Sequence, residues 1–188
     1  MPTQAGEPDV PHRQPVNDAS TVAALVRSAQ RGDRDAYGAL YLRFGRVVNG
    51  VLLAYVSPDD APDLVQDVFL HAWSRLRSLR DPAAFGGWVA QIARNMAKMK
   101  WRSMVTMMPL DDQLPAPGSE HADGLDGQRV LAAIRSLPEP YREPLVLRLV
   151  EGMSGAEIAA RTGLTAGSVR VNLHRGMGML RQKLGGIV

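Results

Sequence analysis

The stretch SGAEIAARTGLTAGSVRVNLHRGMGMLRQKL, residues 154–184, decides the fold of the C-terminal part of the chain. Ser154 and Glu157 have the spacing of a capping box, which starts a short helix. Gly163 suits the left-handed residue that closes such a helix, and Thr165 is a good N-cap for a second one. The apolar residues of that second helix share one face: Val169, Leu173, Met177, Leu180 and Leu184. The pattern predicts a helix-turn-helix, whose second helix typically enters the major groove of DNA.

The other face of this second helix is polar and basic. From Arg161 to Lys183 the sequence has five basic residues and no acidic one. An arginine can bind O6 and N7 of guanine with two hydrogen bonds, and a valine can contact a thymine methyl group. The residues of this face predicted to contact DNA are Thr165, Ser168, Arg170, Val171, Asn172, His174 and Arg175. The alternative is a plain αα-hairpin whose basic helix faces only solvent.

The charge of the whole chain falls into blocks. The 188 residues carry a net charge of +3, but residues 1–19 carry −2, 20–104 carry +5, 105–127 carry −5 and 128–188 carry +5. The first segment contains four prolines, and the acidic segment combines three prolines with three glycines. We therefore expect a disordered tail and a flexible linker. The two basic blocks have helical periodicity, so the sequence predicts an all-α protein of two small domains.

Composition excludes several classes of protein. Without cysteine there is no disulfide framework, no cysteine nucleophile and no thiolate zinc site. The four histidines are scattered, and no nucleophile–base pair or phosphate-binding loop is present, so we expect no catalytic residue, no metal and no cofactor. No apolar stretch approaches the ~18 residues of a membrane span, and the N-terminus lacks the pattern of a signal peptide. We expect a cytoplasmic protein without membrane insertion.

The last predicted helix of the first block is also basic. Residues 84–102, AFGGWVAQIARNMAKMKWR, contain four basic side chains and no acidic one, so those charges are expected to need an external anion or water. Phe85, Trp88 and Trp101 are interleaved with them. Basic groups can follow phosphates while aromatic faces stack on unpaired bases. The alternative is that these aromatic side chains belong to the core.

The preceding predicted helix, about residues 61–76, differs in character. Asp63, Gln66, Asp67 and Leu70 recur at helical spacing and form an acidic and apolar ridge. Such a ridge suits a protein partner with basic helices. A solvated helix face explains the same pattern equally well.

Four segments of the sequence carry a resemblance to a known family. They are Gly32-Asp33 through Leu40-Tyr41, DLVQDVFLHAW at 63–73, FGGWVAQIARNMA at 85–97, and LPEPYREPLVLRLVEGMSGAEIAARTGLTAGSVRVNLHRGMGMLRQKL at 137–184. Together they resemble bacterial RNA polymerase sigma factors of the extracytoplasmic-function (ECF) type, within the sigma-70 family. The resemblance covers about 20–102 and 128–184, with both modules in the expected order.

The resemblance implies a division of the chain and partners for each part. Residues 1–19 would be a tail, 20–104 region 2, 105–127 the linker, and 128–188 region 4. Region 2 would bind core RNA polymerase and melt the −10 element, and region 4 would read the −35 element of promoter DNA. Many relatives also bind an anti-sigma factor. A sigma factor reads sequence and leaves the chemistry to the polymerase, so no enzymatic activity is expected.

The resemblance also implies site residues. The polymerase-binding ridge would comprise Asp63, Leu64, Gln66, Asp67 and Leu70. The −10 element would be contacted by Arg77, Ser78, Leu79, Arg80, Asp81, Phe85, Trp88, Arg94, Asn95, Lys98 and Arg102. The −35 element would be read by Arg170, Val171, His174 and Arg175. The family often has arginine at Asn172 and a small polar residue at Val171, and Gly176 and Gly178 are weaker helix formers, by ~1 kcal/mol each relative to alanine.

Other functions are compatible with parts of the sequence. A stand-alone helix-turn-helix regulator would share the C-terminal motif, but it would need a sensor or dimerisation domain that the first block does not suggest. A helical adaptor whose basic faces bind acidic proteins would share the charge pattern. Binding to DNA without polymerase would identify the regulator, and steeply salt-dependent binding to promoter DNA would exclude the adaptor.

Overall fold

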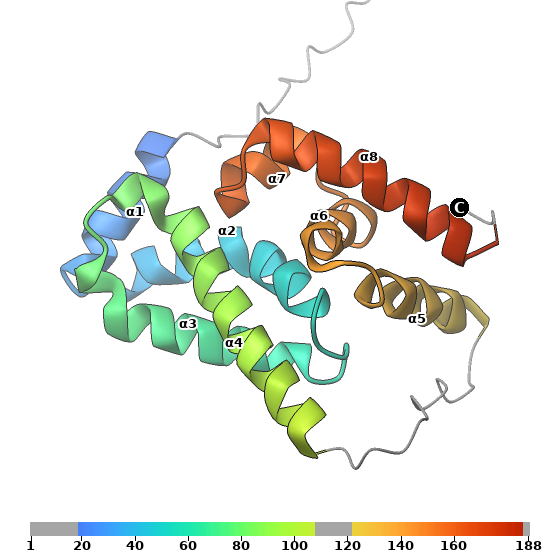
Figure 1. Ribbon diagram of the computed structural model, residues 1–188. Coiled ribbons are helices and arrows are strands. Elements are labelled where there is room, and N and C mark those ends of the chain that lie inside the picture. Colours follow the sequence, from blue (N-terminus) through green and yellow to red (C-terminus); the bar gives the residue numbers. More distant parts are fainter. Residues whose placement is uncertain (1–18, 108–121, 186–188) are drawn as a thin grey trace, which may run out of the picture.

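The computed structural model describes the backbone of residues 19–107 and 122–185, and within these ranges it is helical and without strands (Figure 1). The N-terminal half contains α1 (Ala19–Gln30), α2 (Arg34–Leu53), α3 (Ala61–Arg75), the short 3₁₀ helices η1 (Leu76–Ser78) and η2 (Pro82–Ala84), and α4 (Phe85–Met107). The C-terminal half contains α5 (Ala122–Arg135), α6 (Glu139–Leu149), α7 (Gly155–Thr162) and α8 (Ala166–Lys183). The predicted all-α fold is confirmed.

Helix α2 is the centre of the N-terminal half and packs against α1, α3 and α4. Two residues mark its start: Gly32 takes a positive φ of 100°, and the Asp33 side chain accepts a hydrogen bond from the Ala36 backbone N–H at 3.0 Å. Leu40 and Val47, on its inner face, are fully buried. Burying an aliphatic side chain of this size contributes roughly 1.5–3 kcal/mol, so the periodic apolar face of α2 contributes substantially to the stability of the bundle.

The predicted helix-turn-helix is present as α7 and α8. The Ser154 hydroxyl accepts from the Glu157 N–H at 3.2 Å, and the Glu157 carboxylate accepts from the Ser154 N–H at 2.9 Å, which completes the capping box. Gly163 closes α7 in the left-handed conformation, with φ of 75°. Thr165 caps α8 by accepting from the Ser168 N–H at 3.1 Å.

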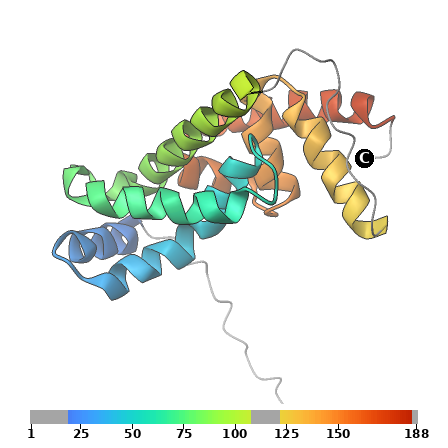
Figure 2. The ribbon, with the colours of Figure 1, turned by 90° about the horizontal axis from the view of Figure 1, so that it is seen from below.

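Helix α6 connects the two halves. Its successive residues Leu145, Val146 and Leu147 are all fully buried, because α6 packs against α5 and α8 in its own half and against α2 in the other. A helix with neighbours on every side needs apolar residues on every face. Figure 2 shows α6 between α8 and the helices of the N-terminal half. In this structure the two predicted domains therefore share one hydrophobic core.

The predicted linker is shorter than expected. Helix α4 continues to Met107 and α5 begins at Ala122, so both ends of the segment 105–127 are helical. Its middle, residues 108–121, lies outside the described residues, and so does the predicted tail up to residue 18, whereas Ala19 already begins α1. The domain boundaries stay predictions. No helix within the described ranges is long and apolar enough to cross a membrane.

Candidate nucleic-acid interface

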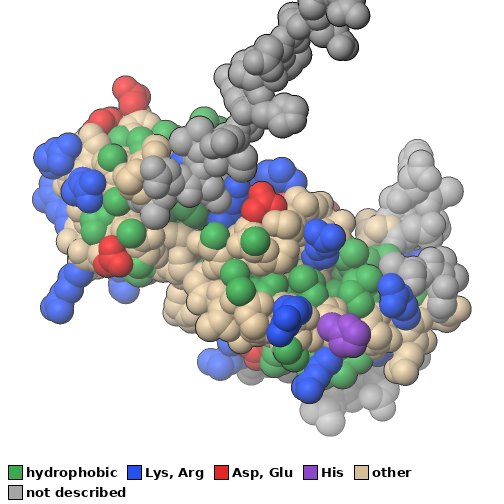
Figure 3. Space-filling view, turned by 90° about the horizontal axis from the view of Figure 1, so that it is seen from above, with side chains coloured by type: hydrophobic (Ala, Val, Ile, Leu, Met, Phe, Trp, Pro, Cys, Tyr) green, Lys and Arg blue, Asp and Glu red, His purple; other side chains and the backbone are tan. Residues whose placement is uncertain are grey.

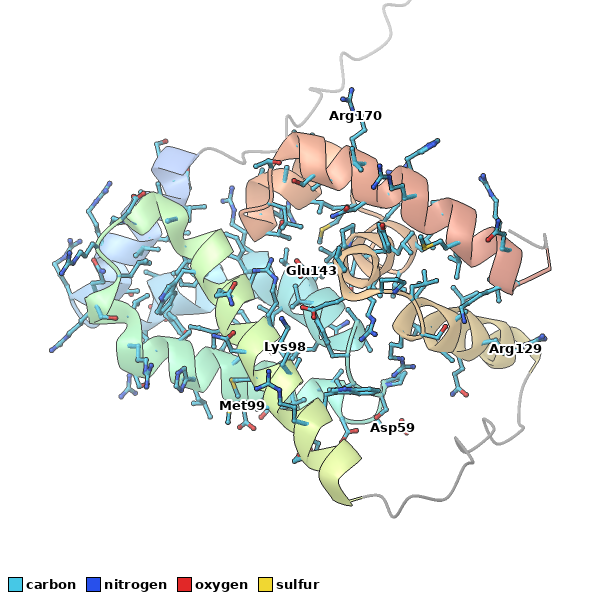
Figure 4. The ribbon with its side chains drawn as sticks, viewed as in Figure 1. Asp59, Lys98, Met99, Arg129, Glu143 and Arg170 are labelled. Atoms are coloured by element: carbon cyan, nitrogen blue, oxygen red, sulfur yellow. The ribbon has the colours of Figure 1, made fainter. Side chains whose placement is uncertain are left out.

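The outer face of α8 is open to solvent. Thr165, Ser168, Arg170, His174 and Arg175 are exposed, Val171 is 42% exposed, and Asn172 is half-buried. Figure 3 shows basic side chains, with a histidine among them, on the half of the molecule that carries α8. In Figure 4 Arg170 points away from the body of the protein. The structure thus brings the residues predicted to read the −35 element onto one accessible surface.

Close packing on α6 holds this surface in place. Gly176 is buried where α8 meets α6, and a Cβ there would lie 3.0 Å from Leu145 Cδ1 and 3.1 Å from Tyr141 Cβ. Val169 and Leu180, on the same face of α8 as Gly176, are also buried. Gly176 therefore allows a close approach between helices, and α8 continues as a regular helix past both Gly176 and Gly178 to Lys183.

The basic residues of α4 lie in a different environment. Arg94 forms a two-pronged ion pair with Glu143 of α6, with Nε–Oε2 at 2.6 Å and Nη2–Oε1 at 2.7 Å. Lys98 pairs with Glu139 at the start of α6, and Lys100 pairs with Asp60 at 3.5 Å. The expectation that the α4 charges need an external anion or water is wrong for Arg94, which is largely buried against Glu143. Lys98 and Lys100 also have carboxylate partners within the chain, and both remain partly exposed to water.

The aromatic residues of α4 also divide. Phe85 is fully buried, with its ring 5.2 Å from that of Phe44, so in this conformation it is a core residue that no base can touch. Trp88 packs against the core and is half-buried, whereas Trp101 is 42% exposed. Asn95 is exposed at the surface of α4, and so is Arg102. Of the α4 residues predicted to contact the −10 element, Phe85 is thus buried in the core and Arg94 is engaged by Glu143.

The loop between α3 and α4 consists of η1 and η2. Gln30 of α1 donates hydrogen bonds to the carbonyl oxygens of Leu76 and Leu79, at 3.0 and 2.9 Å, and so holds the loop against the bundle. Asp81 caps η2 by accepting from the Ala83 N–H at 3.0 Å. Leu79 is half-buried, and the other predicted base-contacting residues of the loop are exposed: Arg77, Ser78, Arg80 and Asp81.

The predicted ridge on α3 is exposed and borders an apolar groove. Asp63, Gln66 and Asp67 are exposed, Leu70 is 68% exposed, and Leu64 is half-buried. Beside the ridge, α2 and α3 form a groove of about 510 Å³. It is lined by Arg34, Tyr37, Gly38, Tyr41, Gln66, Phe69, Leu70 and Trp73. Its lining is mostly apolar, and the carboxylates of Asp63 and Asp67 lie on α3, which forms one of its walls. This combination suits an amphipathic helix that carries basic residues.

Sequence reasoning missed the polar contacts between the two halves. Glu151, just after α6, accepts from Arg46 Nε at 3.0 Å and from Asn49 Nδ2 at 2.9 Å, both on α2. Arg135 of α5 donates to the Val56 carbonyl oxygen at 2.6 Å. Glu143 could have drawn attention, because it stands directly before the apolar run Pro144–Leu147. A carboxylate in such a buried helix segment needs a cationic partner.

The electrostatics of these contacts follow from burial and pairing. Burial lowers the pKa of Arg94, but its hydrogen bonds and charge interaction with Glu143 outweigh this effect and leave the pKa raised. The hydrogen bond from Lys98 holds the pKa of Glu139 below its ordinary value. Burial, followed by the nearby charges of Glu139 and Glu143, raises the pKa of Tyr55. The contact therefore keeps the ionised form of Glu139 and the neutral form of Tyr55 at physiological pH.

Comparison with known proteins places these surfaces in a family. The family model "Sigma-70 region 2" matches residues 40–104, and "Sigma-70, region 4" matches residues 127–180. The ECF RNA polymerase sigma-E factor of Haemophilus influenzae is 31% identical over 180 residues, which are 87% of this chain and 95% of the relative. The chain belongs to the ECF family of RNA polymerase sigma factors. The sigma-E factor of Escherichia coli K12 is also 31% identical, over 85% of this sigma factor and 92% of its own length.

Solved structures agree with this assignment. CnrH in complex with the cytosolic domain of CnrY superposes with a TM-score of 0.65 and 25% identity, over 89% of this chain and 99% of that one. The sigma factor RpoE from Bartonella quintana, in complex with the anti-sigma factor NepR, has a TM-score of 0.57 and 22% identity, over 82% and 99% of the two chains. The second likeness supports the fold of this sigma factor. The described residues contain no group of three or more histidine, aspartate or glutamate side chains placed to hold a metal ion.

Proposed function

We propose that this sigma factor binds core RNA polymerase and directs initiation at promoters whose −35 element it reads with α8 and whose −10 element it melts with its N-terminal half. The observation that carries the proposal is the exposed basic face of α8 on a fully capped helix-turn-helix. Family membership supports the same role.

Reading of the −35 element is proposed for Arg170, Val171, His174 and Arg175. Their side chains extend from one face of α8, and the described residues offer no ion pair to any of them. Thr165 and Ser168 lie at the start of α8, where backbone N–H groups and the helix dipole favour a phosphate. Asn172 lies between Val171 and His174 along α8, and its side chain is half-buried. Base contacts would set sequence preference while the helix start sets the register.

Holding of the unpaired −10 strand is proposed for the η1–η2 loop and α4. The loop presents Arg77, Ser78, Arg80 and Asp81 to solvent, and Gln30 fixes its backbone from α1. Taking one base out of the stack costs a few kcal/mol, which a preformed pocket can offset. Trp88, Asn95, Lys98 and Arg102 would follow the strand along α4. Lys98 is available for this only after it leaves Glu139, and Arg94 can join only after it leaves Glu143.

Binding to polymerase is proposed for the ridge of α3 and the groove beside it. The exposed carboxylates of Asp63 and Asp67 would meet basic residues of a partner helix, and Leu70 with the groove would take its apolar residues. Because one solved neighbour was crystallised with an anti-sigma factor, we propose such a partner here too. Its test is inhibition of transcription by a candidate anti-sigma domain, with loss of the polymerase complex on size-exclusion chromatography.

The decisive experiment is transcription in vitro with core polymerase on a library of promoters. The proposal expects a defined set of transcripts that depends on this protein and shares −35 and −10 motifs. No protein-dependent transcript would contradict it. Tight, sequence-specific binding to DNA without polymerase would favour a stand-alone helix-turn-helix regulator instead.

A further inference from the structure

We propose that the two halves of this sigma factor are held closed by an intramolecular latch, which keeps the basic side of α4 from nucleic acid until the halves separate. The latch is defined by three ion pairs: Arg94–Glu143, Lys98–Glu139 and Arg46–Glu151. The inference rests on the proposed function, because α4 is proposed there to follow the melted strand.

The Arg94–Glu143 pair occupies the donors that a phosphate would need. Nε and Nη2 of Arg94 bind the two carboxylate oxygens of Glu143, Nη2 also donates to the Thr162 carbonyl oxygen at 3.0 Å, and Nη1 donates to Gln91 at 3.1 Å. Arginine binds carboxylates and phosphates with the same two-pronged geometry. Only 13% of the Arg94 side chain and 7% of the Glu143 side chain are exposed. Glu143 therefore takes the place of a phosphate within the same chain.

All three carboxylates come from one short stretch of the C-terminal half. Glu139 and Glu143 lie on α6 and Glu151 follows it, whereas their cationic partners lie on α2 and α4. Figure 4 shows Lys98 and Glu143 directed into the space between α4 and α6. Because every pair joins the two halves, the pairs together favour one relative position of the halves.

Close backbone packing accompanies the ion pairs. A Cβ on Gly86, in the first turn of α4, would lie 2.9 Å from the Arg161 carbonyl oxygen of α7, and 2.8 Å from Phe44 Cε1 in its own half. The absence of a side chain at Gly86 therefore lets α4 approach the backbone of α7 closely. A Cβ on Gly50 of α2 would lie 2.6 Å from Leu147 Cδ2 of α6. Contacts this close to the backbone require the two surfaces to be complementary in shape, which is not expected of domains that meet only transiently. The latch thus has both complementary charge and complementary shape.

Closure affects the two proposed DNA-binding surfaces differently. The face of α8 remains exposed in the closed form, whereas Arg94 and Lys98 are engaged by glutamates. Removing one partner of a buried ion pair leaves an uncompensated charge. A variant that lacks the Glu143 carboxylate is therefore expected to shift the ratio of open to closed molecules by on the order of a hundredfold.

Distances between spin labels test the closure directly. The chain has no cysteine, so Ser74→Cys on α3 and Ala132→Cys on α5, both exposed, allow specific labelling for electron–electron double resonance. The labelled full-length protein should give one narrow distance distribution. Glu143→Lys should broaden it toward longer distances, and Arg94→Glu together with Glu143→Lys should restore the narrow distribution.

A control and a second variant keep this test decisive. Asp59 is exposed and forms no ion pair among the described residues, so Asp59→Lys should leave the distribution unchanged. If circular dichroism shows that Glu143→Lys is unfolded, Glu139→Lys, at a residue whose side chain is 52% exposed, takes its place, with Lys98→Glu as its rescue. A broad distribution in the unsubstituted protein, or a narrow one in the folded latch variant, would overturn the proposal.

Binding of single-stranded DNA tests the competition with nucleic acid. Glu143→Gln and Asp59→Asn each remove one negative charge, and only Glu143→Gln weakens the latch. With a fluorescent oligonucleotide of random sequence, Glu143→Gln should bind roughly tenfold tighter or more, because apparent affinity scales with the open fraction. Equal affinities of the two variants would overturn the competition even if the halves open. Failure of the unsubstituted protein in transcription would instead contradict the proposed function and leave the distances unaffected.

Discussion

Helices α4 and α8 have a similar charge and different surroundings. Both are long, carry several basic residues and contain no acidic one. In the folded chain, Arg94, Lys98 and Lys100 of α4 are paired with carboxylates from other elements, whereas Arg170, His174 and Arg175 of α8 face solvent. The difference shows that a helix without acidic residues of its own can still be neutralised by the tertiary structure.

The largest expected effect is a loss of stability when the main ion pair of α4 is removed. Arg94→Ala leaves the buried Glu143 carboxylate without its cation and should lower the free energy of unfolding by about 3–5 kcal/mol. The measurement is chemical denaturation followed by circular dichroism. Lys100→Ala is the control, because the pair with Asp60 is partly exposed and should matter little. A loss as small as that of the control would contradict the burial of the Arg94 pair.

Arg170→Ala should have the opposite profile. Its side chain is exposed, so the free energy of unfolding should change by less than about 0.5 kcal/mol. Binding of the polymerase complex to promoter DNA should weaken by about 1–3 kcal/mol, with relaxed preference at one base of the −35 element. Competition between promoter variants for the polymerase complex measures both the binding affinity and the base preference. An unchanged base preference would remove Arg170 from the reading surface.

Asp67→Lys tests a third surface that neither basic helix includes. Asp67 is exposed on α3 beside the apolar groove, and reversing its charge should weaken binding to core polymerase about tenfold, or ~1.4 kcal/mol. Thermal unfolding should hardly change. Asp59→Lys reverses a charge just before α3, eight residues from Asp67 along the chain, and should bind polymerase normally. Equal binding by both variants would argue against the ridge.

The smallest expected effect is a dependence on acid. The pKa of Glu139 is lowered by its hydrogen bond from Lys98, so the ionised carboxylate stabilises the folded protein above its ordinary pKa. This contribution should be lost as the pH falls below about 4, through the lowered pKa. Melting curves over this range should therefore differ between the unsubstituted protein and Glu139→Gln, which lacks the titrating group. If the melting temperatures of the two proteins changed equally with pH, the pair of Lys98 and Glu139 would add nothing to stability.

The helix-turn-helix was predictable residue by residue. The capping box of Ser154 and Glu157, the left-handed Gly163 and the Thr165 cap are all confirmed, because each depends on neighbours within a few positions along the chain. The exposed face of α8 followed from its helical period for the same reason. The buried position of Phe85 was left open by the sequence, since its spacing fits both a core residue and a base-stacking one.

The sequence by itself therefore determined the helices, their caps, the sigma-factor family and the polar face of α8. Only the tertiary structure decided that Arg94 meets Glu143, 49 residues away along the chain, and that Arg46 meets Glu151 across 105. The physical reason is the range of the interactions. Caps and helical periodicity are set within a turn or two, whereas an ion pair between distant helices exists only after the core around α2 and α6 has brought those helices together.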